Sequence, residues 1–320
     1  MSNLNSNATT GQSATIPISV PSGSTLRVVR QPVNGSVHVS GNSLVYQSDP
    51  TFEGTDQVTF AAMSNAAKDS TSAVASVRVT SPTRPSLTTA GVTSAATYQA
   101  PLAPGTIAVL QGKGLGPSPL KTFELNSGGF IEKSTGSARV LFDGVPAPVI
   151  YASDAATAAI VPYGVAGQTS TNVVVQYNGI SSTAVQVPLA ATAPGVFTAD
   201  SSGTGNAAAV NQDGTLNSAS NPVPRGSIVT LFLTGDGIES PIPPDGKLST
   251  APYPATMARV TVTIGGKTAA VAYAGSAPTA VAGLMQVNVT VPADAPTGAV
   301  PVVVSCDGAP SQGGIVIQVK

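Results

Sequence analysis

The sequence predicts an all-β protein built from three tandem β-sandwich domains, and three observations support this. Its 320 residues include 33 glycines and 27 prolines among many serines, threonines and valines, which suits short strands and turns better than helices. Short β-branched runs alternate with turn residues about every 8 to 12 residues, as in sandwich folds. The last two-thirds of the chain contain two copies of one pattern.

The repeat is visible as phrases that recur in the same order. They are PGTIAVLQGKGLG at 104–116 with RGSIVTLFLTGDG at 225–237, LFDGVPAPVIY at 141–151 with TIGGKTAAVAY at 263–273, and VVVQYNG at 173–179 with VVVSCDG at 302–308. The first pair is 121 residues apart and the last 129, so roughly eight residues are inserted in the second copy. A period of this length is a whole domain used twice rather than a solenoid repeat.

The first domain is predicted over residues 15–82, after a polar and unpatterned tail at 1–14. Its expected strands lie at 15–20, 25–30, 43–47, 57–61 and 73–80. Asn34-Gly35 and Gly41-Asn42 are hairpin signals around a short segment at 37–39. A linker containing Pro85 follows at 83–86, within a proline-bearing stretch that favours an extended spacer.

The second and third domains are predicted over 87–193 and 194–320. In each of them, short strands flank two-residue turns. These turns are Asp143-Gly144 and Asn178-Gly179 in one domain, and Gly265-Gly266 and Asp307-Gly308 in the other. An extra hairpin around Asp213-Gly214 is predicted to open the third domain.

The first domain resembles bacterial cadherin-like and Ig-like repeats. The matching residues are Asn34, Gly35, Val37, Tyr46, Pro50, Phe52, Gly54, Asp56 and Phe60. The resemblance implies an adhesive or spacer module with Tyr46, Phe52 and Phe60 in its core. Some relatives bind calcium, but this chain lacks their tandem acidic linker. Asp49, Glu53 and Asp56 supply fewer ligands than the six to eight oxygens that calcium prefers.

Residues from Leu87 onward resemble the uncharacterised C-terminal region of secreted proteins from Acidobacteria, especially the Solibacter lineage. Whole phrases carry this resemblance, including AAIVPYGVAGQTSTNVVVQYNG and NPVPRGSIVTLFLTGDG. Each half is also similar to an IPT/TIG Ig-like domain, in which P-G-x-x-V-x-x-x-G-x-x-x-G forms the first strand and turn. The combined prediction is three tandem immunoglobulin-like β-sandwich domains in an elongated arrangement.

Composition excludes several classes of function. The formal charge is −1 and 9% of residues are charged, which disfavours nucleic-acid binding and anionic membrane surfaces. No apolar run is long enough to span a bilayer. The N-terminal residues lack the basic and apolar regions of a signal peptide, so an extracellular location implies processing or another export route. Cys306 is the single cysteine and is expected to be a small buried residue.

A search for chemistry predicts no catalytic, cofactor-binding or metal site. His38 is the only histidine, and no G-x-S-x-G accompanies it. Gly112, Gly114 and Gly116 resemble part of a dinucleotide loop, but no helix follows, so a turn needing positive φ is the better interpretation. Paired carboxylates for glycoside hydrolysis are not excluded by spacing, although Asp143, Asp213, Asp245 and Asp307 each precede glycine as turn residues do.

The predicted function is therefore a non-enzymatic extracellular structural or adhesive protein. It is either a spacer module, or the subunit of a surface filament in which Thr15, Ile16, Ile18 and Val20 add a strand to a neighbouring sheet. Its partners are then itself or other cell-surface proteins. The alternative is a carbohydrate-binding module of a secreted polysaccharide-active protein. Tyr98, Tyr163 and Tyr253 are the candidate stacking residues for a polysaccharide.

Overall fold

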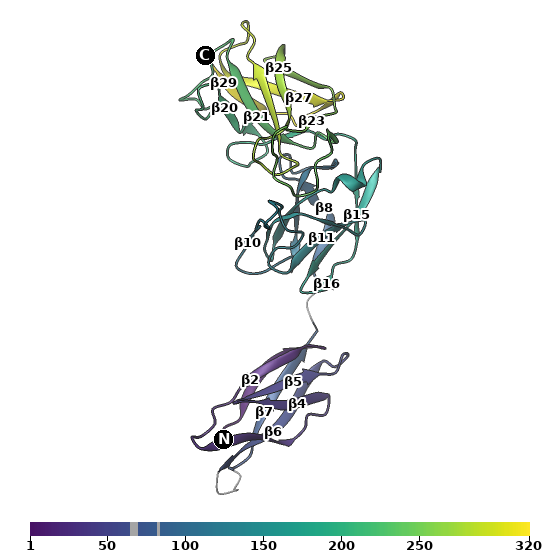
Figure 1. The fold of residues 1–320 in the computed structure, drawn as a ribbon, viewed down its shortest axis with the longest axis vertical. Coiled ribbons are helices and arrows are strands. Elements are labelled where there is room, and N and C mark those ends of the chain that lie inside the picture. The colour runs from purple at the N-terminus through teal and green to yellow at the C-terminus, as the bar shows by residue number, and fades with distance from the viewer. Residues whose placement is uncertain (65–69, 82–83) are drawn as a thin grey trace. The chain divides into compact units, whose positions relative to one another are not determined.

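The computed structural model describes residues 1–64, 70–81 and 84–320. They form two compact units, Met1–Thr83 (unit 1) and Arg84–Lys320 (unit 2), coloured purple to blue and blue to yellow in Figure 1. Strands make up the regular structure of the described residues, together with one short 3-10 helix, η1 (Tyr163–Val165). The boundary between the units falls in the predicted linker 83–86. Of that stretch, residue 83 lies outside the described residues, and Ser86 already begins a strand.

Unit 1 is a sandwich of two sheets. Its strands are β1 (Leu4–Thr9), β2 (Ser13–Pro17), β3 (Ser24–Arg30), β4 (Gly35–Ser40), β5 (Ser43–Ser48), β6 (Gly54–Ser64) and β7 (Ala73–Thr80). The strand order is β1-β7-β6-β3 in one sheet and β2-β5-β4 in the other. The predicted hairpin at Gly41-Asn42 joins β4 to β5, whose ends pair at Ser40 and Ser43.

The prediction of a polar tail at 1–14 is wrong, because most of that segment is strand. β1 pairs in parallel with β7 from Leu4 opposite Ala75 to Thr9 opposite Thr80. β2 begins at Ser13, inside the predicted tail, and pairs with β5. Backbone hydrogen bonds to these neighbours hold a segment whose side chains are mostly polar and among which Ala8 alone is buried.

The core of unit 1 confirms two of the three predicted aromatic residues. Tyr46 and Phe60 are fully buried, whereas Phe52 is half-buried and packs against the edge of the core. Asp56 is also buried. Its carboxylate accepts hydrogen bonds from the backbone N–H groups of Val33 (3.1 Å) and Asn34 (2.9 Å) and from the Tyr46 hydroxyl (3.2 Å). Asp56 therefore fixes the turn before β4, which explains the acidic residue in the motif.

Unit 2 contains two sandwiches with separate hydrophobic cores, here called copy 1 (86–188) and copy 2 (195–319), joined by residues 189–194. The strands of copy 1 are β8 (Ser86–Ser94), β9 (Ile107–Lys113), β10 (Lys121–Thr122), β11 (Ala138–Phe142), β12 (Val145–Ala147), β13 (Val149–Ala152), β14 (Ala156–Ile160), β15 (Ser170–Tyr177), β16 (Ile180–Ser181) and β17 (Val185–Pro188). They form one sheet in the order β10-β13-β14-β9-β8 and another in the order β12-β11-β15-β16, with β17 beside β15.

Copy 2 repeats this arrangement. Its strands are β18 (Gly195–Val196), β19 (Gly205–Asn206), β20 (Ala209–Asn211), β21 (Ile228–Thr234), β22 (Glu239–Ser240), β23 (Ala255–Thr256), β24 (Val260–Ile264), β25 (Lys267–Ser276), β26 (Met285–Thr290), β27 (Gly298–Cys306), β28 (Ala309–Pro310) and β29 (Ile315–Val319). They form one continuous sheet because β25 pairs first with β24 and then with β26, whereas copy 1 divides the same segment into β12 and β13.

The duplication extends to irregular details. β9 and β21 occupy equivalent positions, 121 residues apart, and each pairs with the equivalent neighbour, β14 or β26. Both copies carry a β-bulge at the same place, between Val149 and Tyr151 and between Val271 and Tyr273. The two tyrosines are half-buried and lie outside the core clusters, so the repeat preserves their position without placing them in a core.

The four predicted two-residue turns of unit 2 are present. Both residues of each turn have positive φ, from +47° at Asp143 to +85° at Gly308, as a type I′ hairpin requires. The extra hairpin of copy 2 is also present, with a bridge between Val210 and Leu216. At its turn, the Gln212 side chain accepts a hydrogen bond from the backbone N–H of Ile228, the first residue of β21 (3.0 Å).

Candidate functional site

The two copies of unit 2 meet at a contact region that we call the seam. Its centre is Thr234, the fully buried last residue of β21 in copy 2. The Thr234 hydroxyl accepts a hydrogen bond from the backbone N–H of Ile107 in copy 1 (2.8 Å) and donates one to the carbonyl of Gly283 (2.8 Å). The Thr234 side chain thus provides a hydrogen-bond partner for the backbone N–H of Ile107, the first residue of β9, across the seam.

Two glycines let the connecting segment pack against β21. Gly235 and Gly237 have φ near +85°, and a Cβ at either position would overlap a backbone carbonyl of the connection, that of Ala193 or of Ala191. The N–H of Ala193 donates to the Gly235 carbonyl at 2.7 Å. Residues 189–194 are therefore a packed part of the seam.

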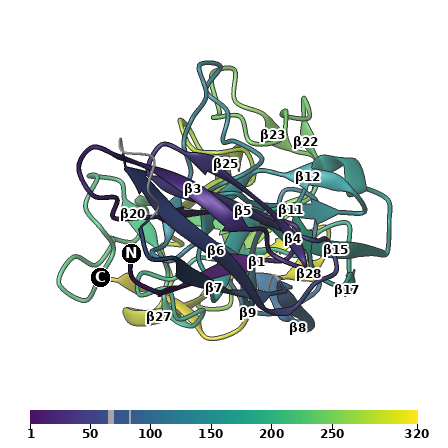
Figure 2. The same cartoon turned by 90° about the horizontal axis from the view of Figure 1, so that it is seen from below.

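A long loop from each copy completes the seam. These loops follow β9 and β21, so they are equivalent in the repeat, and Figure 2 shows a teal loop and a green loop projecting together from unit 2. Phe130 forms an antiparallel bridge with Lys247, whose ammonium group lies 5.9 Å from the centre of the Phe130 ring. The N–H of Ile131 also donates to the Gly246 carbonyl at 2.8 Å.

Two carboxyl groups are buried beside these contacts. Asp236 is 2% exposed and Glu239 is 1% exposed. Burial raises the pKa of Asp236 to about 6, although a hydrogen bond with the Thr256 side chain acts in the opposite direction. Burial and the nearby Asp236 raise the pKa of Glu239 to about 7, and the Ser276 hydroxyl, which donates to Glu239 Oε2 at 2.6 Å, limits the rise.

Tyr163 lies against this buried pair from the side of copy 1. The side chain is 6% exposed, and its hydroxyl is buried without a hydrogen-bond partner among the described residues. Burial, followed by the carboxyl groups of Glu239 and Asp236, raises its pKa well above the usual value for tyrosine. Its backbone N–H donates to Asp245 Oδ1 at 3.0 Å. Tyr163 is therefore an interior residue of the seam, and its prediction as an exposed ligand contact is wrong.

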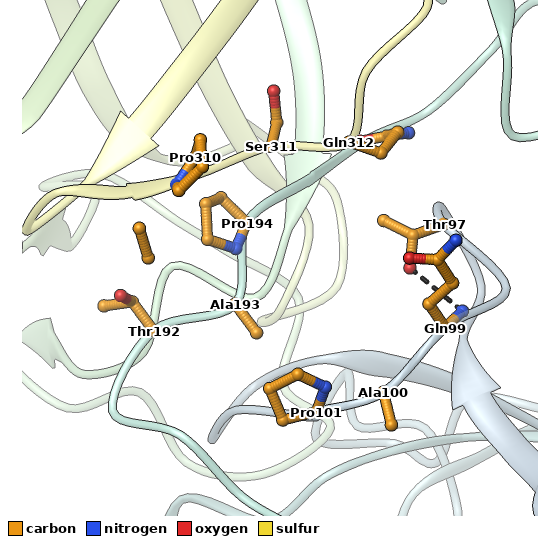
Figure 3. Close-up of a pocket in the computed structure, with 11 residues that line it drawn as sticks. Thr97, Gln99, Ala100, Pro101, Thr192, Ala193, Pro194, Pro310, Ser311 and Gln312 are labelled. Atoms are coloured by element: carbon orange, nitrogen blue, oxygen red, sulfur yellow. Dashed lines mark hydrogen bonds between the residues drawn. The ribbon is translucent and has the colours of Figure 1, made fainter.

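An open pocket of about 310 Å³ lies at the edge of the seam (Figure 3). Three segments line it: 97–101 from copy 1, the connection at 192–194, and 309–312 from copy 2. Gln312 is committed to structure, because its amide donates to the Val196 carbonyl (2.7 Å) and accepts from the Val196 N–H (2.9 Å). The lining contains hydroxyls, amides and prolines and no charged side chain.

Tyr98 and Tyr253 are the two candidate ligand contacts that the structure leaves on the surface. Tyr98 is 40% exposed and lies in the chain between two pocket-lining residues, Thr97 and Gln99. Its hydroxyl donates to the Ser201 carbonyl of copy 2 at 2.8 Å. Tyr253 is 37% exposed and belongs to the copy 2 loop between β22 and β23. The structure does not bring the three tyrosines together into one platform.

The segment predicted to donate a strand is paired within its own domain. Thr15 lies opposite Val45 in the β2–β5 ladder, and Ile16 and Ile18 are buried in the core of unit 1. Val20 is half-buried and packs against the same core. Donation of this segment to another chain would therefore require it to leave the sheet of unit 1.

The other residues considered for chemistry have structural surroundings. His38 is exposed on β4 opposite Val45. Cys306 is buried at the end of β27, as expected, and burial raises its pKa to about 12. Of the Gly112, Gly114 and Gly116 turn, only Gly114 has positive φ. The other two are needed for close approach, since a Cβ at Gly112 would overlap the Ser86 carbonyl.

Across the described ranges, no group of three or more histidine, cysteine, aspartate or glutamate side chains is arranged to hold a metal ion. None of the described helices is long and apolar enough to cross a membrane.

Sequence reasoning missed Thr234, Asp236 and Glu239, the residues that build the seam. The repeat itself held a signal for one of them, because Asp236 aligns with Leu115 at the 121-residue offset. Asp245 was explained as a turn residue before Gly246. It does occupy that turn, but its carboxylate also binds the backbone of the other copy.

No family model matches the sequence, and no curated protein matches it. Among solved structures, the chain is similar to the SGBP-B protein of the Bacteroides ovatus mixed-linkage glucan utilization locus, in complex with a mixed-linkage heptasaccharide. The two are 12% identical, with a TM-score of 0.29 over 98% of this chain and 65% of that one. It is also similar to an endo-fucoidan hydrolase of glycoside hydrolase family 107, at 12% identity and a TM-score of 0.26 over 97% of this chain and 42% of that one.

A third similar structure is Drosophila N-cadherin EC1-3, at 12% identity and a TM-score of 0.26, covering 99% of this chain and 98% of that one. The chain spans less than two-thirds of the length of the first two proteins. At TM-scores this low the similarities carry no argument about function. The strand pairing itself identifies tandem immunoglobulin-like sandwiches.

Proposed function

We propose that this chain is a non-enzymatic extracellular structural protein, in which unit 2 is a rigid spacer made of two sandwiches. The observation that carries this proposal is the seam. Thr234, the connection at 189–194 and the equivalent loops bind one copy to the other, so they hold the two sandwiches in one orientation. A spacer needs such a fixed joint, because separate domains on a loose linker change their relative orientation freely. The resemblance of residues 87–320 to secreted proteins of Acidobacteria supports the extracellular location.

The rigidity of the joint can be measured with spin labels. Thr183 in copy 1 and Thr297 in copy 2 are exposed, and the native Cys306 is buried. Labels at Thr183→Cys and Thr297→Cys should give a distance distribution as narrow as that of a reference pair within copy 1, Thr183→Cys and Ala155→Cys. At pH 5, a broad or bimodal distribution for the cross-seam pair alone would contradict the spacer proposal.

The second form of the proposal is a filament subunit joined by strand addition. Because Thr15 pairs with Val45, a Thr15→Cys/Val45→Cys disulfide would hold β2 in its own sheet. Light scattering and negative-stain electron microscopy would then compare the oxidised and reduced variant. Filaments that form only after reduction support strand donation, and filaments that form equally well in the oxidised state reject it. If the wild-type chain remains at its monomer mass of 31.5 kDa, the filament form is rejected and the spacer form is retained.

A carbohydrate-binding module is the second candidate function, and Tyr98 favours it. This exposed ring is fixed by its hydrogen bond to Ser201, and its neighbours in the chain, Thr97 and Gln99, line an uncharged pocket that offers hydroxyls and amides. Aromatic faces beside polar groups suit sugar rings. If a glycan array identifies a ligand, Tyr98→Ala should weaken binding about tenfold, the size of a lost stacking contact. Tyr98→Phe should retain most of the affinity, and Tyr253→Ala serves as the control because Tyr253 lies in another loop.

A further inference from the structure

The two acids of the seam stand out because the other copy has no counterpart for them. Asp236 aligns with Leu115, a fully buried core residue of copy 1. Beyond Gly237 the offset grows by one, and Glu239 aligns with Pro117. The duplicated fold therefore does not need a carboxyl group at either position. Both acids lie where copy 2 contacts copy 1.

Among the described residues, no positively charged side chain acts on the pair to balance it. Besides burial, the Thr256 side chain and a backbone N–H act on Asp236, and the Asp236 carboxyl and the Ser276 hydroxyl act on Glu239. The pair in turn acts on Tyr163 in copy 1 and on Tyr273 and Cys306 in copy 2. Asp245 and Asp307 add further acidic groups around Tyr163 and Cys306. No lysine or arginine in the described part of the chain contributes to either shift.

The hydrogen bonding around Asp236 and Glu239 also permits each carboxyl group to be protonated. Asp236 Oδ2 is buried and has no partner among the described residues. Glu239 accepts from Ser276 through Oε2, and a serine hydroxyl can turn to accept a hydrogen bond when the carboxyl is protonated. A buried charge without a partner is costly, whereas a neutral carboxyl in the same place is not.

We propose that Asp236 and Glu239 make the seam an acid-tightened latch, which holds the two copies together when both carboxyls carry a proton and loosens when they ionise. The sign follows from the direction of the shifts. In the unfolded chain both acids ionise near pH 4, but in the folded chain they hold their protons to about pH 6 and 7. Stability is therefore highest in acid, falls as the pH rises above 4, and reaches its low plateau above about pH 7.

The first test is thermal unfolding of the full chain at pH 5 and pH 8. The unfolding temperature of unit 2 should be higher at pH 5 by about 5 °C or more, because burial raises the pKa of Asp236 to about 6 and that of Glu239 to about 7. The carboxyls with lowered pKa, such as Asp143 and Asp294, act mainly below this pH window. Asp236→Asn/Glu239→Gln should remove the difference between pH 5 and pH 8, while the exposed Asp154→Asn should keep it. An equal unfolding temperature at both pH values in the wild type would overturn the proposal, as would an unchanged difference in the double variant.

A second measurement keeps the test valid if the double variant fails to fold. Carbon-13 spectra of the wild-type side chains should show the Asp236 and Glu239 carboxyls titrating above pH 5, and midpoints near pH 4 for both would overturn the latch. Calcium at millimolar concentration is a further arm at pH 8. If calcium restores the pH 5 unfolding temperature, a metal ion rather than a proton neutralises the pair, and the proposal is again overturned.

The biological use of the latch rests on the proposed spacer function, but the two can fail separately. The Thr183/Thr297 label pair should give a narrow distribution at pH 5 and a broader one at pH 8. A distribution that is broad at both pH values contradicts the rigid spacer. One that is narrow at both pH values preserves the spacer and contradicts the latch.

Discussion

Copy 1 and copy 2 of unit 2 share a common strand pairing, one β-bulge and their type I′ turns, but they differ in polarity at a buried position. Copy 1 places Leu115 in its hydrophobic core, and copy 2 places a buried Asp236 at the equivalent point of the backbone, between the two glycines that contact the connection. The repeated backbone thus accommodates either an apolar or an acidic side chain at this position. In a duplicated protein, the positions where the copies differ in polarity while remaining buried identify the surface between them.

Exchanging these two residues should have the largest effect on the free energy of unfolding. Leu115→Asp places a carboxyl in a hydrophobic core that evolved without one, so it should lower the free energy of unfolding by about 4 kcal/mol at pH 7. The reverse change, Asp236→Leu, removes a buried charge and should be neutral or stabilising at pH 8. Urea unfolding of both variants measures this, and equal losses would show that the two positions are not environmentally distinct.

A smaller but still large effect is expected from the glycines before these residues. Gly235→Ala would overlap the Ala193 carbonyl and also force alanine into positive φ, which together should cost about 3 kcal/mol. Gly114→Ala, at the equivalent position, meets only ordinary contact with Pro85 at 3.6 Å, so it should cost about 1 kcal/mol for its φ alone. Comparable unfolding temperatures for the two variants would mean that the connection can move away from β21.

The mildest of the three predictions concerns the hydroxyl at the centre of the seam. Thr234→Val keeps the shape but leaves the N–H of Ile107 without its partner, so a loss of about 1–2 kcal/mol is expected. Its equivalent in copy 1 is Lys113, which is exposed, and Lys113→Ala should change stability by less than about 0.5 kcal/mol. Faster hydrogen exchange at Ile107 in Thr234→Val would localise the loss to the seam. Unchanged exchange there would argue against the bridge.

The turns and most strands were predictable because their causes are local. Asp143-Gly144 and Asp307-Gly308 carry the residues that positive φ requires, whatever surrounds them. β1 was missed for the opposite reason. Its sequence LNSNAT has almost no apolar alternation, and only Ala8 is buried, so pairing with β7 and not side-chain burial defines it as a strand.

The seam could not be predicted from local patterns, because its residues become neighbours only when the two copies pack. Tyr163 has the sequence context of a loop, but it is buried at the seam, where its backbone N–H donates to Asp245 of the other copy and its hydroxyl is within electrostatic reach of Glu239 and Asp236. Tyr98 and Tyr253 share that loop context and remain exposed. Only a comparison of the two copies, residue by residue, could have marked Asp236.

The extra hairpin of copy 2 limits how far this architecture can grow. In copy 1 the N–H of Ile107 receives its partner from the next copy, whereas at the equivalent Ile228 the protein supplies Gln212 from its own hairpin. Copy 2 also has Ala293 where copy 1 has Tyr163. For a third copy, the Ile228 N–H at the docking end of copy 2 would already be paired with Gln212, and copy 2 would lack the tyrosine that copy 1 contributes to the seam. The end of copy 2 equivalent to the seam is therefore capped by its own hairpin, and the joint between the two copies is not reproduced there.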